Sequence, residues 1–147
     1  MKVQRLLLVG VVLAAVYFGG VQRGFIPARQ DASTDTHSAD ALTAAFENHR
    51  SNVQVQGSGQ VSRVLPDDIE GSPHQRFIVR LASGQTVLIA HNIELAPRVD
   101  SLKAGDQVEF NGEYEWNERG GVVHWTHRDP RGGHVAGWIR HNGRTYQ

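Results

Sequence analysis

The residues best suited to chemistry lie close together near the C-terminus. Between Gly120 and Trp138 the sequence reads G-G-V-V-H-W-T-H-R-D-P-R-G-G-H-V-A-G-W. The candidate functional residues in this window are three histidines, an arginine and an aspartate: His124, His127, His134, Arg128 and Asp129. Imidazoles titrate near neutral pH and bind metals, and a carboxylate can complete a metal site or orient a histidine. The window therefore predicts a functional site.

The spacing inside the window favours one set of metal ligands. His124 and His127 point to opposite faces of an ideal strand, so they share an ion only if the strand ends or bends near Thr126. His127 and Asp129 are two residues apart and can lie on one side, with His134 as a third ligand. Three protein ligands leave a position for water or substrate. The expected cofactor is a divalent ion, namely Mg, Mn or Zn.

A second candidate cluster depends on an expected hairpin. If Ser83 and Gly84 form a two-residue turn, Arg76 stands opposite His91. Opposed residues share a face, and His74, two residues before Arg76, joins them there. A slip of one residue would reverse the faces.

Together, the two clusters favour a metal-dependent phosphodiester hydrolase, which means a nuclease-like enzyme with nucleic acid as its substrate. His74, His91 or His127 would act as general base or metal ligand. Arg76 or Arg128 would stabilise the developing phosphate charge.

The alternative function is a non-enzymatic binding module for a metal, an oligosaccharide, a nucleic acid or a partner protein. No recognised nuclease signature occurs, and R-G-G-H-V-A-G-W is a poor start for the helix that a ββα-metal nuclease places after its histidine strand. In such a module the histidines would be ligands or a pH-sensitive surface.

Several of these residues also have structural interpretations. His124 beside Trp125 is either catalytic or a hydrogen-bonded structural histidine, and His141 is expected on the surface. Asp67 and Asp68 either shape a turn or supply a metal carboxylate. One strand carries an acidic row that is expected to be solvated and to repel phosphate: Glu109, Glu113 and Glu115. Three tryptophans either stack on bases or sugars or fill the core: Trp116, Trp125 and Trp138.

Composition restricts the class of protein. The chain of 147 residues has room for one domain, and its 15 basic and 15 acidic residues leave no formal net charge. A basic footprint for duplex nucleic acid is therefore absent at the level of the whole chain. Cysteine is also absent, which excludes disulfide partners, a thiol nucleophile and thiolate metal sites.

Residues 1–26 are interpreted as a signal peptide or signal anchor. Lys2 and Arg5 precede an apolar run from Leu6 to Val21, which favours targeting over a buried core helix. Residues 27–40 have few large apolar side chains and are expected to be a flexible linker. The domain is expected to be periplasmic or secreted, and an uncleaved anchor would attach it to the inner membrane.

Residues 41–147 are expected to form one mainly β domain. A short helix from about Ala41 to His49 opens it, with Leu42, Ala45 and Phe46 on one face. Period-two alternation then predicts five strands, beginning near Val53, Phe77, Val87, Val108 and Val122, with a turn or loop over 65–73. A last hairpin turns at Asn142-Gly143. Gly57 and Gly59 suggest that the first strand is strongly curved.

This order of elements predicts a small five-stranded OB-like barrel with one short N-terminal helix. Another small barrel or a sandwich is the alternative. Six motifs resemble a family of small exported bacterial proteins, domain of unknown function 3465: L-P-D-D (65–68), H-Q-R-F (74–77), A-H-N-I (90–93), G-D-x-V-x-F-x-G-x-Y-x-W (105–116), H-W-T-H-x-D-P (124–130) and G-W-I (137–139). The resemblance covers roughly residues 50–147. It implies a compact exported domain and carries no activity.

Overall fold

The computed structural model describes residues 41–147 of the chain. The expected targeting segment (1–26) and linker (27–40) lie outside the described residues. Within the described part of the chain, no helix is long and apolar enough to cross a bilayer.

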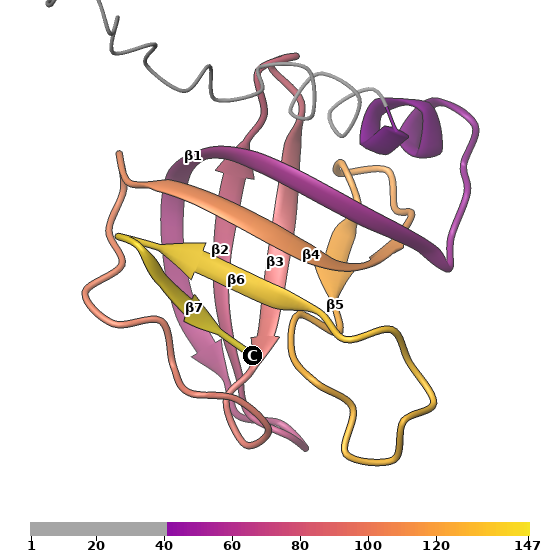
Figure 1. Cartoon of the computed structure of the whole chain (residues 1–147). Helices are drawn as coiled ribbons and strands as arrows, with labels where there is room; N and C mark the ends of the chain where they lie inside the picture. Colours follow the sequence, from indigo (N-terminus) through magenta and orange to yellow (C-terminus); the bar gives the residue numbers. More distant parts are fainter. Residues whose placement is uncertain (1–40) are drawn as a thin grey trace, which may run out of the picture. The chain divides into compact units, whose positions relative to one another are not determined.

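The described residues form one short helix and a mainly β domain (Figure 1). The helix covers residues 41–47 and buries Leu42 and Ala45 against the core, as expected from the spacing of its apolar residues. The strands are β1 (Val53–Asp68), β2 (His74–Arg80), β3 (Thr86–Asn92), β4 (Gln107–Glu115), β5 (Val122–His124), β6 (Trp138–His141) and β7 (Arg144–Tyr146).

Alternation in β4 separates the core from the outer surface. Val108, Phe110 and Tyr114 are buried, whereas the glutamates between and after them point outward. Successive side chains of a strand point to opposite faces, so this pattern confirms the half-buried strand. Phe77 of β2 and Ile89 of β3 meet these residues in a single apolar cluster.

The long strand β1 bends so that it pairs with two partners. Its first half, up to Gln60, pairs with β4, and its second half, from Gln60 onward, pairs with β2. Gly57 and Gly59 permit the bend because a Cβ there would collide with the Phe110 ring and with the Arg80 carbonyl, respectively. The expected curvature is confirmed.

The expected turn over residues 65–73 is wrong in its first half. β1 continues to Asp68 because Leu65 pairs with Arg76 and Asp68 with His74. A register shift between Leu65 and Asp68 accommodates Pro66, which lacks the N–H that a regular ladder requires.

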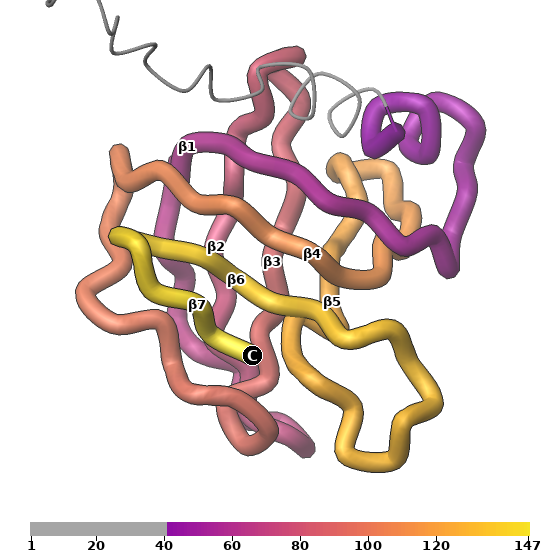
Figure 2. Tube along the Cα trace, viewed as in Figure 1, coloured from indigo at the N-terminus to yellow at the C-terminus, as the bar shows by residue number. Residues whose placement is uncertain are grey.

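Five strands close into a ring in the order β1-β2-β3-β5-β4, with β4 returning to β1. The β3–β5 pair is parallel and the other pairs of the ring are antiparallel. β5 and β6 share the second edge of β4, where β5 pairs with Glu113–Glu115 and β6 with Val108–Asn111. The loop of residues 125–137 leaves the sheet between these two pairings (Figure 2).

The hairpin of β6 and β7 forms as predicted. Asn142 and Gly143 have φ values of 49° and 74°, which a type I′ turn requires. His141, however, is not on the surface as expected. Its side chain is buried, and its Nε2 lies 2.9 Å from Oδ2 of Asp106.

Candidate functional site

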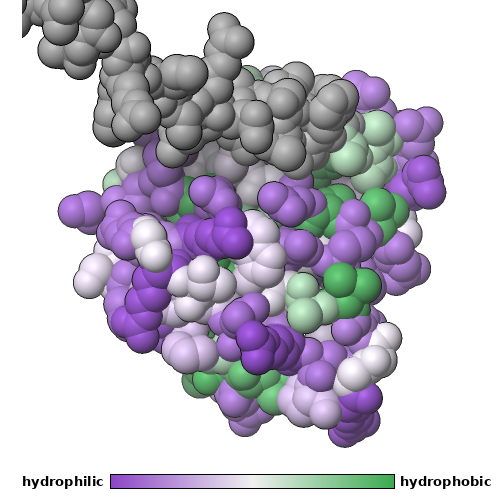
Figure 3. Space-filling model, in the orientation of Figure 1, coloured by the Kyte–Doolittle hydropathy of each residue, from purple (hydrophilic) through white to green (hydrophobic). Residues whose placement is uncertain are grey.

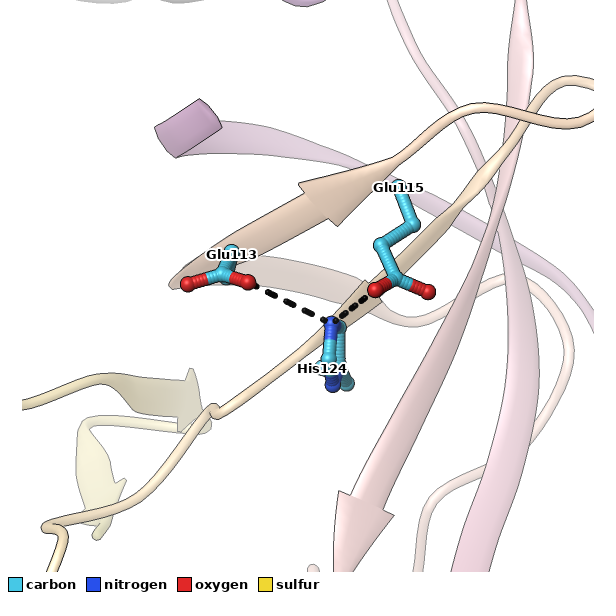
Figure 4. Close-up of side chains that lie close together, drawn as sticks. All are labelled: Glu113, Glu115 and His124. Atoms are coloured by element: carbon cyan, nitrogen blue, oxygen red, sulfur yellow. Dashed lines mark ion pairs between the residues drawn. The ribbon is translucent and has the colours of Figure 1, made fainter. Parts of the chain in front are cut away.

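Two glutamates and a histidine converge on the outer face of the sheet. Glu113 of β4 stands opposite His124 of β5, and Glu115 projects from the same face two residues further along β4. Nε2 of His124 lies 3.5 Å from Oε1 of Glu115 and 3.9 Å from Oε1 of Glu113 (Figure 4). Among residues 41–147, these three form a group whose ligand atoms all lie within 4.8 Å of one another. We call them the Glu-Glu-His group.

The spacing of this group differs from that of a hydrogen-bonded pair. A direct N–H···O bond measures about 2.7–3.2 Å, and the His141–Asp106 pair falls in that range at 2.9 Å. Nε2 of His124 is shielded from solvent and has no hydrogen-bond partner within the described part of the chain. Metal bonds of about 2.0–2.1 Å in tetrahedral geometry place neighbouring ligands about 3.3–3.4 Å apart. The 3.5 Å separation from Glu115 is close to that ligand spacing, and the 3.9 Å separation from Glu113 is longer.

A second imidazole approaches the same carboxylate from the loop. Nδ1 of His134 lies 3.4 Å from Oε2 of Glu113. The ring of His134 stacks on Trp125, with centroids 3.7 Å apart and an angle of 14° between the planes. Trp125 has a φ of 52°, a left-handed conformation that is costly for a bulky residue and that ends β5 directly after His124.

Two glycines let the loop between β5 and β6 pack closely against β4 at this point. A Cβ on Gly112 would collide with the carbonyl of His124, and one on Gly137 would collide with the carbonyls of Trp125 and Asn111. The N–H of Gly137 donates to the carbonyl of His127 at 3.0 Å. This close backbone packing brings the loop near the Glu-Glu-His group.

The predicted ligand set of His127, Asp129 and His134 does not come together. His127 is buried, and its Nδ1 donates to the carbonyl of Arg128 at 2.8 Å. The carboxylate of Asp129 accepts N–H groups within its own loop, from Arg131, Gly133 and His134. These bonds, first that from Arg131, hold the pKa of Asp129 below its ordinary value of 3.8. His134 is the member of the set that faces the Glu-Glu-His group.

The expected hairpin cluster of His74, Arg76 and His91 is also wrong. Leu81 and Gln85 close a three-residue turn, in which Gly84 has a φ of 87°, and the register therefore slips by one residue. His91 consequently stands opposite Gln75 and faces the core, whereas Arg76 faces outward.

His91 is a buried structural histidine. Its Nε2 donates to the carbonyl of Pro97 at 3.0 Å, and its Nδ1 accepts the hydroxyl of Thr126 at 2.8 Å, because a carbonyl can only accept. Burial lowers the pKa of His91 from 6.5 to about 4. The ring is therefore neutral at pH 7 and ties β3 to the start of the loop.

The remaining predicted catalytic residues lie apart from the group. Nδ1 of His74 is 2.7 Å from the carbonyl of Ser72. Arg76 donates twice to the carbonyl of Pro66, at 3.1 Å each. Arg128 is exposed on the loop.

The structure also shows where the aspartate pair at residues 67–68 and the three tryptophans lie. Asp67 pairs with Arg98 through both carboxylate oxygens, and this contact lowers the pKa of Asp67. Of the three tryptophans, Trp116 packs against the core cluster. Trp138 carries the guanidinium of Arg140 over its ring at 4.2 Å.

Sequence reasoning missed Glu113 and Glu115 as candidate ligands. Their alternation placed them on the outer face of β4, which is where they lie. Figure 3 shows that the surface turned toward the viewer in Figure 1 is largely hydrophilic. The missing signal was the pairing of Glu115 with Val122 across the 116–121 connection, which puts Glu113 opposite His124.

The comparisons with known proteins identify a family. No curated protein matches the chain. The family model described as "Protein of unknown function (DUF3465)" matches residues 28–147, which include every residue of the candidate site. This is the family that the sequence motifs indicated, and the match extends further toward the N-terminus than they did. The chain therefore belongs to this family of unknown function.

Proposed function

We propose that this chain is an exported OB-like barrel domain that binds a divalent metal ion through Glu113, Glu115 and His124. The observation that carries the proposal is Nε2 of His124, which has no hydrogen-bond partner among residues 41–147 and lies between two carboxylates. Without an ion, a shielded acceptor or donor that has no partner costs free energy. A cation would satisfy all three groups at once.

The chemistry of the group suits a divalent cation. One imidazole and two carboxylates supply one nitrogen and at least two oxygen ligands, which match Zn²⁺ and Mn²⁺. The two carboxylate charges offset those of the ion. Glu113 and Glu115 project from one rigid strand and His124 from its neighbour, so the ligand positions are largely preformed.

Two further parts of the proposal rest on other observations. The ring of five strands with its parallel β3–β5 pair supports classification as an OB-like barrel. Lys2 and Arg5, followed by the apolar run, support export to the periplasm or beyond. If the segment stays uncleaved, the domain is anchored at the inner membrane.

A metal-dependent phosphodiester hydrolase is the second candidate function. It is favoured because three protein ligands leave positions open for water, whose pKa a bound metal lowers. The residues expected to assist catalysis support it less. His91 is buried with both ring nitrogens bonded, and Arg76 is held by Pro66. The acidic face also repels phosphate.

Metal titration tests the first proposal. The full chain, purified in mild detergent, is titrated calorimetrically with Zn²⁺, Mn²⁺ and Mg²⁺. The wild type is expected to bind one ion, and Glu113→Gln and His124→Ala are expected to lose roughly tenfold or more in affinity. Glu109→Gln is the matched control, because Glu109 lies in the same acidic row but pairs with Arg140. A wild type that binds no ion, or Glu113→Gln with unchanged affinity, overturns the proposal.

Cleavage assays separate the two candidates. Single- and double-stranded DNA and RNA are incubated with the wild type, His124→Ala and Glu109→Gln, with each metal and with EDTA. The hydrolase would be established if EDTA stops cleavage and if His124→Ala loses cleavage while Glu109→Gln keeps it. Metal binding without cleavage would establish the binding module.

A further inference from the structure

We propose that His134 is the fourth ligand of the ion, so that the site selects Zn²⁺ and similar transition metals over Mg²⁺ and Ca²⁺. This inference rests on the proposed metal site of Glu113, Glu115 and His124. It adds a ligand from the 125–137 loop. This ligand determines which ion the site binds and whether a coordination position stays open.

The positions of the two carboxylate oxygens of Glu113 indicate this ligand. Oε1 lies 3.9 Å from Nε2 of His124, and Oε2 lies 3.4 Å from Nδ1 of His134. Each oxygen of one carboxylate thus faces a different imidazole. The 3.4 Å separation exceeds a normal hydrogen bond, so His134 approaches the carboxylate of Glu113 without a direct hydrogen bond to it.

The loop holds His134 in position from two sides. Asp129 accepts the N–H of His134 at 3.1 Å and that of Gly133 at 2.7 Å, so the backbone before the imidazole is pinned. The ring itself lies flat on Trp125. A residue held in this way loses less side-chain freedom when it binds an ion.

Coordination requires His134 to move toward the other ligands. It lies outside the group of three whose atoms fall within 4.8 Å. Its side chain is 36% exposed and the loop belongs to no strand, so a movement of the loop toward β4 would leave the strand pairing intact. Ion binding should therefore draw the loop onto β4.

The added imidazole determines which ions fit. Mg²⁺ and Ca²⁺ prefer oxygen ligands and water, whereas Zn²⁺ accepts imidazole and carboxylate together. Two nitrogens and two carboxylates fill a tetrahedral shell. Closed four-ligand sites are typical of structural zinc, and catalytic sites keep a position open. A fourth ligand thus favours the binding module over the hydrolase.

The experiment compares His134→Ala and His134→Phe with the wild type of the full chain. The phenylalanine keeps an aromatic ring on Trp125 but provides no ligand atom. Zn²⁺ affinity is measured by calorimetry, and Co²⁺ is added as a spectroscopic probe, because four-coordinate Co²⁺ absorbs visible light much more strongly than six-coordinate Co²⁺. His74→Ala is the control, because it also removes a histidine but His74 contacts the carbonyl of Ser72, apart from the group.

Both His134 variants are expected to lose roughly tenfold or more in Zn²⁺ affinity, and their Co²⁺ absorption should weaken toward the six-coordinate level. Their affinity for Mg²⁺ should stay unchanged. If His134→Phe keeps the wild-type Zn²⁺ affinity and Co²⁺ spectrum while His124→Ala loses both, His134 is not a ligand. A wild type that binds no ion would instead overturn the proposed function itself.

Discussion

Glu113 of β4 stands directly opposite His124 of β5, and both side chains project from the outer face of the ring. This pair depends only on the register of two strands. His134, by contrast, reaches Glu113 from the loop between β5 and β6, which packs closely against β4 at Gly112 and Gly137. The site thus has one half fixed by strand pairing and one half whose position depends on how the loop is held.

Gly137→Ala should destabilise the domain by about 1–3 kcal/mol, which is the usual cost of overpacking. The new Cβ would collide with the carbonyls of Trp125 and Asn111, so the loop must shift away from β4. Urea unfolding measures the loss. Val135→Ala removes an exposed side chain from the same loop and should change the stability by less than about 0.5 kcal/mol. Equal stability of both variants would show that the packing at Gly137 is not tight.

Asp129→Ala should weaken Zn²⁺ binding although Asp129 is not assigned as a ligand. The substitution removes the acceptor of three loop N–H groups, so His134 is no longer pinned beside Glu113. We expect a loss of about tenfold in affinity, measured by calorimetry. Asp100→Ala is the control, because Asp100 forms an exposed ion pair with Arg144. Unchanged affinity in Asp129→Ala would mean that the loop bonds do not position His134.

The stability of the domain should fall as the pH drops from 7 to 5.5, partly through His91. Its pKa is about 4 in the folded chain against an ordinary value of 6.5. The unfolded chain therefore binds more protons between these values, and this stability is present above pH 6.5 and is lost as the pH falls toward 4. This proton binding lowers the free energy of unfolding by about 1 kcal/mol between pH 7 and 5.5.

Urea unfolding at pH 7 and 5.5 checks this linkage in the wild type and in His91→Gln. Glutamine does not titrate, so the variant should be less stable at pH 7 but should lose less stability on acidification. This window lies above the range in which Asp67 and Asp129 titrate, since the pKa of each is lowered from 3.8. An identical pH dependence in both proteins would contradict the assignment.

Trp125 should report ion binding through its fluorescence. Its ring stacks on His134 at 3.7 Å, so a paramagnetic ion such as Cu²⁺ or Ni²⁺ held by His134 should quench its emission. Trp125→Phe should abolish most of the quenching but leave the affinity within a few-fold of the wild type. Quenching that survives in Trp125→Phe would place the ion nearer to another tryptophan.

Features set by local chain geometry were predictable from the sequence. The helix follows from the spacing of Leu42, Ala45 and Phe46, and the hairpin turn from Asn142-Gly143. The inward and outward faces of β4 follow from alternation, which needs no knowledge of the partner strand. The motif residues also indicated the family, which the match over residues 28–147 confirms.

Features that depend on register were not predictable. One extra residue in the turn that ends at Gly84 put His91 opposite Gln75 and not opposite Arg76, so His91 lies in the core, because side chains change face with every residue of a strand. The same rule explains why Glu113 could not be matched with His124 before the length of the 116–121 connection was known.

The sequence by itself determined which residue types could bind a metal or act as bases, since that depends on side-chain chemistry alone. It also determined the order of the main strands along the chain and the two faces of β4, which depend on local periodicity. Only the tertiary structure decided which of these side chains meet. Glu113 and Glu115 come from one strand, His124 from another and His134 from a loop, and their distances depend on strand pairing and on the close backbone contact at Gly137. Such long-range contacts have no signature in the spacing of residues along the chain.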